Sequence, residues 1–308
     1  MHYQFQKTLS SAISFKGIGL HTGLISNVKL IPGKDDQGIV FKRVDLEKDN
    51  IILANYKNVS STELCTTLKN DSGISVSTVE HLMAAFYLTG IDNIIVEIDN
   101  SEIPIMDGSS KDFIKMIEER GLINLYSKRK YLKILKKLEL KENKKFISIE
   151  PNDSSLTVDF ELGYNNKIIG NQKNYISFDT GNLEDIYSSR TFCLHEDIEA
   201  IKSSGLAKGG SLDNAIVIKG EEVLNRDGLR NKKEFVNHKI LDLVGDFLLS
   251  GYRILGDIKC IQGGHSLSNT FLKEIFKNQS NFQVVSINQA HLVQKEFKIA
   301  YKKLAVNA

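Results

Sequence analysis

Three side chains that can bind a metal or move a proton recur at one-turn spacing between residues 235 and 246. At 3.6 residues per turn, His238, Asp242 and Asp246 share one face of a helix. Apolar residues occupy the rest of that helix: Val236, Ile240, Leu243, Val244, Phe247 and Leu248. Because these polar side chains lie beside a buried apolar surface, each of them needs a hydrogen-bond partner or a metal ion. His238 and Asp242 can hold two corners of a tetrahedral zinc site, and the alternative is an ordinary helix with a capped histidine and solvated acids.

A second helix start carries a candidate third ligand. Hydroxyl residues open the segment 75–90, an apolar run follows, and Gly90 ends it, which predicts a helix. His81 lies at its start next to Glu80, as a metal ligand beside a general base would. The alternative for Glu80 is a capping box with Ser77, since the two residues have the required spacing.

The two helix starts belong to an internal repeat. Each half of the chain shows a Val-x-His sequence that opens an apolar helix, a glycine stop at Gly90 or Gly251, and a strand at 93–98 or 254–260. Repetition at about half the chain length predicts an α+β fold of two similar domains, each a sheet with helices on one face, with the helix starts converging. Convergence would bring His81 to His238 and Asp242.

Composition narrows the class of protein. The chain has 308 residues, 41% hydrophobic and 25% charged, with Lys+Arg 40 against Asp+Glu 38 and a net charge of +2. This balance argues against a nucleic-acid partner. Cys65, Cys193 and Cys260 are odd in number and widely spaced, which favours a reducing compartment. Without a signal sequence or an apolar run of spanning length, we expect a cytoplasmic protein with no membrane span.

Strand and turn signals suggest where the domains meet. Short strands are predicted at 7–13, 25–31 and 38–44, and a hairpin-like segment at 50–60. A Lys-rich stretch at 126–145 reads as a solvated linker and strand edge. We therefore predict an N-terminal α+β domain at 1–126 and a C-terminal α+β domain at 127–308.

Together, the candidate residues could catalyse metal-assisted hydrolysis. A His2Asp zinc site leaves a fourth position for water, whose pKa the metal would lower. Glu80 could accept the proton of that water. His265, in a Gly-Gly-His turn, could donate a proton to a departing amine, with Asp246 holding it protonated and oriented. Thr191 could donate a hydrogen bond to the developing oxyanion.

Five motifs together resemble, in order and spacing, the UDP-3-O-acyl-N-acetylglucosamine deacetylases, zinc amidases of lipid A synthesis. The motifs are Thr78-Val79-Glu80-His81-Leu82, Glu102-Ile103-Pro104-Ile105-Met106-Asp107-Gly108-Ser109, Ser189-Arg190-Thr191-Phe192, Phe235-Val236-Asn237-His238-Lys239-Ile240-Leu241-Asp242 and Gly264-His265. The resemblance spans nearly the whole chain. It implies two β-α-α-β domains, each with a small insert, and an active site between them.

The resemblance also implies a role for each site residue. It makes His81, His238 and Asp242 the Zn²⁺ ligands and assigns catalytic parts to Glu80, His265, Asp246 and Thr191. It places Lys239 near the diphosphate of a UDP-sugar that carries one acyl chain, and His21 in the sugar pocket. Phe192 and the segment 193–217 would form the second insert, an apolar passage for the acyl chain. We expect the enzyme to be a monomer that releases acetate and the free amine.

One sequence departs from the family pattern. Many members have Lys-Ser-Gly-His where this chain has Gln262-Gly263-Gly264-His265, so a cation near phosphate is missing. Two other functions remain as alternatives. A non-catalytic binder of sugar nucleotides or acyl lipids would not need Glu80, His265 and Asp246, and a zinc peptidase would carry an HExxH motif, which the chain lacks.

Overall fold

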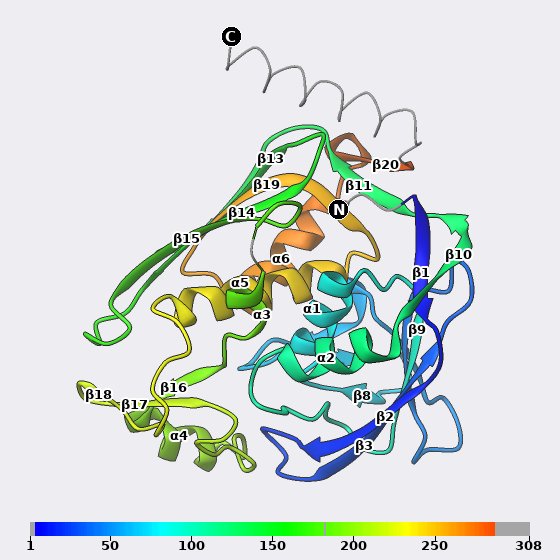
Figure 1. Ribbon diagram of the computed structural model, residues 1–308. Coiled ribbons are helices and arrows are strands. Elements are labelled where there is room, and N and C mark those ends of the chain that lie inside the picture. The colour runs from blue at the N-terminus through cyan, green and yellow to red at the C-terminus, as the bar shows by residue number, and fades with distance from the viewer. Residues whose placement is uncertain (1–3, 182, 287–308) are drawn as a thin grey trace.

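The computed structural model describes residues 4–181 and 183–286. It is built of mixed β-sheets and packed helices (Figure 1), so the predicted α+β class is confirmed. No helix among the described residues is both long and apolar enough to cross a bilayer.

The first large sheet has five strands in the order β2-β3-β9-β4-β5. Their bounds are β2 (Ile13–Ile18), β3 (Ile25–Pro32), β9 (Ile94–Ile98), β4 (Ile39–Arg43) and β5 (Ile51–Leu53). The central strand β9 runs antiparallel to β3 and parallel to β4. Buried and exposed residues alternate along β3, as expected for a sheet with one covered face. Helix α2 (Lys111–Arg120) packs on β2 through Phe113 and Phe15, whose ring centroids are 5.5 Å apart.

The second large sheet contains the order β12-β13-β19, and β14 and β15 continue it on the other side of β19. Their bounds are β12 (Leu138–Glu142), β13 (Lys145–Pro151), β19 (Arg253–Ile261), β14 (Leu156–Gly163) and β15 (Asn171–Ser177). The beginning of β19 also pairs with β11 (Lys130–Ile134), which pairs in turn with β20 (Phe282–Ser286). Helix α5 (Glu234–Leu248) packs on β14 and β15, and α6 (His265–Phe276) packs on β12 and β13.

The two sheets have the same topology. In each, the central strand is antiparallel to the second strand of one hairpin and parallel to the first strand of another. In each, a helix precedes the central strand and another follows it: α1 (Glu80–Thr89), β9 and α2 in one case, α5, β19 and α6 in the other. This agrees with the internal repeat. The domain limits 1–126 and 127–308 remain a prediction.

Smaller elements complete the described chain. One three-stranded sheet contains β6 (Val59–Ser61), β7 (Thr67–Lys69) and β8 (Ser75–Val76), another β16 (Phe192–Leu194), β17 (Ile216–Lys219) and β18 (Glu222–Val223), and β1 (Phe5–Leu9) pairs with β10 (Leu122–Lys128). Short helices are α3 (Glu184–Tyr187) and α4 (Ile198–Ser203), with 3-10 turns η1 (Tyr56–Asn58), η2 (His195–Asp197) and η3 (Gln279–Asn281).

Two local expectations were wrong. The predicted strand 7–13 is two strands, because the chain turns after Leu9, where the Ser10 amide donates to the Gly121 carbonyl at 3.0 Å. The segment 50–60 is not a hairpin, because β5 pairs with β4 whereas β6 pairs with β7. Both errors concern which strand a residue pairs with, which local sequence does not encode.

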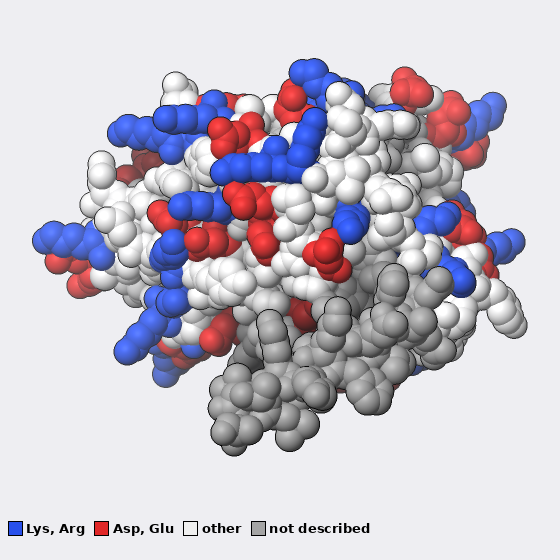
Figure 2. Space-filling model, turned by 90° about the horizontal axis from the view of Figure 1, so that it is seen from above, with Lys and Arg blue, Asp and Glu red and all other residues white. Residues whose placement is uncertain are grey.

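The Lys-rich stretch 126–145 is not a linker. It contains β11 and β12, and Arg129 within it is 1% exposed. Its guanidinium donates to the Gly90 carbonyl at 2.6 Å and binds the Asp92 carboxylate, so it fixes the end of α1. The lysines form surface ion pairs, such as Lys137 with Glu150 at 3.0 Å. Figure 2 shows basic and acidic side chains interspersed over one face of the protein.

Helices α1 and α5 pack against each other (Figure 1). Their closest approach includes Gly245, where an added Cβ atom would lie 2.1 Å from the Glu80 carbonyl oxygen and 3.1 Å from the Ala84 amide nitrogen. Both neighbours are backbone atoms, so a side chain at 245 could be accommodated only if one helix shifted as a whole. The absence of a side chain at 245 therefore sets how closely the start of α1 approaches α5.

We predict that Gly245→Ala destabilises the protein. Overpacking of this kind typically costs roughly 1–3 kcal/mol. Thermal unfolding should show a lower Tm, whereas Gly264→Ala, where an added Cβ meets nothing within 4 Å, should unfold close to the wild type. Equal Tm values for the two variants would mean that the helix contact does not constrain the fold.

Candidate metal centre and active site

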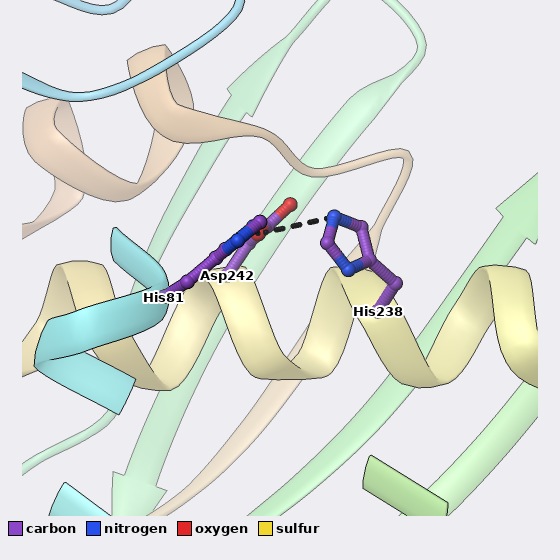
Figure 3. Close-up of side chains that lie close together, drawn as sticks. All are labelled: His81, His238 and Asp242. Atoms are coloured by element: carbon purple, nitrogen blue, oxygen red, sulfur yellow. Dashed lines mark ion pairs between the residues drawn. The ribbon is translucent and has the colours of Figure 1, made fainter. Parts of the chain in front are cut away.

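Three potential ligands meet where α1 crosses α5. His81 comes from the first turn of α1, and His238 and Asp242 lie one turn apart on α5 (Figure 3). All three are at most 4% exposed. One ligand atom from each residue lies within 4.8 Å of the other two. The structure therefore brings together the three residues that the sequence predicted as ligands.

The two spacings that involve Asp242 fit a tetrahedral ion. Asp242 Oδ1 lies 3.4 Å from Nε2 of His81 and 3.4 Å from Nε2 of His238. Ligand bonds of roughly 2.0–2.1 Å at tetrahedral angles place donor atoms about 3.3–3.4 Å apart. Within the described residues, Asp242 Oδ1 is buried and accepts no hydrogen bond. A buried carboxylate oxygen without a donor is what a cation would satisfy.

Neighbouring groups orient the ligands. Nδ1 of His238 lies 3.1 Å from the Ser189 carbonyl, and a proton there leaves the Nε2 lone pair facing Asp242. Burial lowers the pKa of His238 to about 3, which keeps the imidazole neutral, as a metal ligand must be. Lys239 donates to Asp242 Oδ2 at 2.9 Å, so this oxygen is occupied and Oδ1 points at the histidines. Although burial acts to raise the pKa of Asp242, the charged Lys239 beside it opposes this, and the pKa lies well below its usual value.

A candidate acid and base stand next to the ligands. Glu80 is 3% exposed, and its Oε1 lies 3.7 Å from His265 Nε2. His265 Nδ1 lies 2.9 Å from Asp246 Oδ2. Thr66 binds two of these carboxylates. Its amide donates to Glu80 Oε2 at 3.0 Å, and its hydroxyl donates to Asp246 Oδ1 at 2.7 Å. The capping-box alternative for Glu80 is wrong, since α1 has no side-chain cap and the Ser77 hydroxyl binds the Ser101 carbonyl instead.

The environment gives these two groups different protonation tendencies. Burial acts to lower the pKa of His265, but the charges of Asp246 and Glu80 outweigh it and raise the pKa to about 10. Burial raises the pKa of Glu80, and the nearby His265 opposes this in part. An imidazolium that can give a proton thus lies beside a carboxylate that can take one.

A small cavity of about 30 Å³ collects most of the predicted site residues. Its walls include Glu80, His265, the three ligands, Lys239, Thr191 and His21. His21 is 6% exposed, and its Nε2 has no hydrogen-bond partner among the described residues. Asp246 does not line this cavity and reaches it through His265, while Phe192 lies beneath Lys239, whose Nζ is 5.5 Å from the ring centroid.

A larger apolar cavity of about 310 Å³ adjoins the small one. The two share Leu20, His21, Leu64 and Thr191 among their lining residues. The rest of the larger cavity is built from β16, η2, α4 and β17, and it includes Phe192, Cys193, Ile198, Ala215, Val217 and Leu224. The predicted insert 193–217 therefore forms a hollow that opens beside the candidate metal centre.

Gln262, which departs from the family pattern expected from the sequence, has a structural role in this chain. Its side chain accepts from the Gly163 amide at 2.8 Å and donates to the Gly163 carbonyl, and its own amide donates to the Glu161 carbonyl at 2.9 Å. Gln262 thus fixes the end of β14 two residues before Gly264. It lines neither of the two cavities.

Two supporting residues escaped the sequence analysis. Thr66 and the Ser189 carbonyl hold Asp246, Glu80 and His238 in place, yet neither stands at a diagnostic spacing from the group it supports. Ser189 lies inside a recognised motif, but its contribution is a backbone atom. Only the fold reveals contacts between residues this far apart in sequence.

Comparisons with known proteins point to one family. The family model described as UDP-3-O-acyl N-acetylglycosamine deacetylase matches residues 6–277. A protein from Glaesserella parasuis named UDP-3-O-acyl-N-acetylglucosamine deacetylase is 38% identical over 297 residues, 96% of this chain and 97% of that protein. One from Nautilia profundicola with the same name is 40% identical over 285 residues, 92% of this chain and 96% of that protein.

We predict that Asp242 and Asp246 separate metal binding from catalysis. Asp242→Ala removes one of three ligand atoms and should lose metal, whereas Asp246→Ala leaves all three in place and should retain it. Inductively coupled plasma mass spectrometry of the purified variants measures this directly. Removing a residue that holds a functional side chain in place typically lowers activity or metal affinity about 10–100-fold. Because Asp246 holds His265 and not a ligand, Asp246→Ala should mainly lower the rate. Equal metal loss in both variants would contradict the division.

Proposed function

Because the chain belongs to the UDP-3-O-acyl N-acetylglycosamine deacetylase family, we propose that it hydrolyses the N-acetyl group of UDP-3-O-(3-hydroxyacyl)-N-acetylglucosamine. The products are acetate and the free amine, in a step of lipid A biosynthesis. Family membership confirms the resemblance noted in the sequence. The observation that carries the proposal is the convergence of His81, His238 and Asp242 beside the Glu80–His265 pair.

We propose that the metal is Zn²⁺, held by His81, His238 and Asp242. The two imidazoles and one carboxylate are a common catalytic donor set for zinc. When bound, zinc would polarise the amide carbonyl and make water at the site more acidic. Elemental analysis of protein purified without added metal tests the identity, and stoichiometric Fe²⁺ with full activity would contradict it.

The remaining steps are assigned to the residues of the small cavity. Glu80 takes a proton from the attacking water, since its carboxylate faces the cavity and the Thr66 amide occupies its other oxygen. His265 gives its Nε2 proton to the departing amine, while Asp246 holds Nδ1 and keeps the ring charged. Thr191, in the wall of the same cavity, donates a hydrogen bond to the developing oxyanion.

The substrate is proposed to lie across both cavities. His21 and Lys239 border the small one, where they would contact the sugar and the diphosphate, and Phe192 begins the wall of the larger one. The larger cavity is apolar enough to hold an acyl chain. Ala215→Phe should fill part of it and lower kcat/KM for long-chain substrates by about 10-fold or more while sparing short-chain ones. A uniform loss across chain lengths would argue against this binding site.

We further propose that the enzyme works as a cytoplasmic monomer. The three candidate ligands meet within one chain, and Cys65, Cys193 and Cys260 are free thiols. Cell fractionation tests the location and light scattering the mass in solution. A membrane or periplasmic fraction, or a stable dimer, would contradict these two statements.

The decisive experiment is acetate release from the acylated UDP-sugar. Activity should disappear on treatment with a tight chelator and return with one equivalent of Zn²⁺. Glu80→Ala should lower kcat by about 10²–10⁴-fold while substrate affinity and metal content persist. Substrate binding without turnover by the metal-loaded wild type would instead support the non-catalytic alternative.

The protonation of His265 gives a pH prediction. The rate should fall as pH rises through the pKa of His265, because the neutral imidazole cannot donate a proton. Asp246→Asn removes the charge that raises this pKa, so the alkaline limb of the pH–rate profile should move to lower pH. Asp99→Asn changes a carboxylate that follows β9 and binds Asn27 in β3, and it should leave the profile unchanged. An unshifted limb in Asp246→Asn would exclude His265 as the titrating acid.

A further inference from the structure

A further buried carboxylate, in addition to Glu80, Asp242 and Asp246, has no role in the proposed chemistry. Glu102 is fully buried, with 0% exposure, in the turn that precedes α2. It lines neither cavity and is not one of the candidate ligands. In the sequence it stands out only as the first residue of the motif 102–109.

Four donors fill the acceptor sites of Glu102. Oε1 accepts from the His21 amide at 2.8 Å and from the Thr78 hydroxyl at 2.9 Å. Oε2 accepts from the Thr22 amide at 2.7 Å and from the Thr22 hydroxyl at 2.6 Å. A carboxylate offers about four lone-pair positions, so its hydrogen-bonding capacity is used completely.

These donors come from two segments whose relative position determines the shape of the site. One is the loop 19–23, which carries His21 to the cavity wall. The other is Thr78, two residues before Glu80, where the backbone turns left-handed with a φ of 56°. That conformation is unfavourable for a β-branched residue, and the bond from its hydroxyl to Glu102 helps to hold it.

The loop is shaped to admit this carboxylate. A Cβ atom at Gly19 would lie 2.3 Å from Glu102 Oε2 and 2.5 Å from the Thr22 hydroxyl oxygen. The same loop reaches the larger cavity, because the amides of Ala207 and Lys208 donate to Nδ1 and to the carbonyl of His21. A shift of Glu102 would therefore move His21, which lines both cavities.

We propose that Glu102 is a positioning residue, which holds His21 and the Glu80–His81 start of α1 in register across the reaction cavity. The proposal rests on the deacetylase function for its kinetic readout. Glutamine has nearly the same shape, but its amide group turns a donor towards two of the four donors. Glu102→Gln therefore removes the acceptor without creating a cavity.

A double-mutant cycle separates positioning from general destabilisation. Glu102→Gln should lower kcat/KM about 10-fold or more in the wild type but less than about threefold in a His21→Ala background, because residues that act together are not additive. Gly19→Ala, which displaces the carboxylate, should behave like Glu102→Gln. Glu234→Gln is the matched control. Glu234 is also 0% exposed, but it binds Arg190 and the Arg230 amide, so its effect should add fully to that of His21→Ala.

Amide hydrogen exchange provides a readout independent of activity. Glu102→Gln should speed exchange at His21, at Thr22 and at the start of α1, with Tm and metal content near those of the wild type. Full additivity with His21→Ala, or faster exchange in only one of the two segments, would overturn the proposal. If the wild type releases no acetate, the proposed function fails, while the exchange experiment still decides whether Glu102 joins the two segments.

Discussion

The contact between helices α1 and α5 is the constraint on which the site depends. At Gly245 the two backbones approach so closely that no side chain fits between Glu80 and α5. Glu80 and His81 are therefore held over the face of α5 that carries His238, Asp242 and Asp246. One crossing supplies the proposed base and one candidate ligand from α1, and two candidate ligands and a supporting carboxylate from α5. Because the contact is between main chains, it fixes the site more firmly than side-chain packing could.

The electrostatics of the crossing explain why a divalent cation belongs there. Glu80, Asp242 and Asp246 are all at most 4% exposed. Lys239 and the charged His265 offset only two of these carboxylates, and Asp242 Oδ1 receives no hydrogen bond among the described residues. A buried negative excess is unfavourable unless a cation joins it. The same cation would draw the pKa of His265 down from about 10 towards neutrality, where an acid catalyst works best.

The sequence predicted which side chains would lie together at the candidate site better than it predicted how the strands pair. The helical period, a local signal, placed His238, Asp242 and Asp246 on one face. The repeat linked His81 to them, because it relates two short segments in opposite halves of the chain. Strand pairing was harder: the break between β1 and β2 and the separate partners of β5 and β6 depend on distant strands. The buried Arg129 was missed for the same reason. Its partners Gly90 and Asp92 lie almost forty positions away, and a run of lysines around it suggested solvent.

Buried carboxylates organise the loops that helix packing leaves free. Glu102 gathers the amides of the His21 loop, and Glu234 accepts from the amide and guanidinium of Arg190 at 3.1 and 2.8 Å. The first loop carries His21, and the second carries the Ser189 carbonyl and Thr191. Loops that line a polar cavity cannot be fixed by apolar side chains without closing it. A carboxylate buried behind each loop orders the backbone from outside the cavity, so the helices can carry the candidate metal ligands while the loops line the cavity.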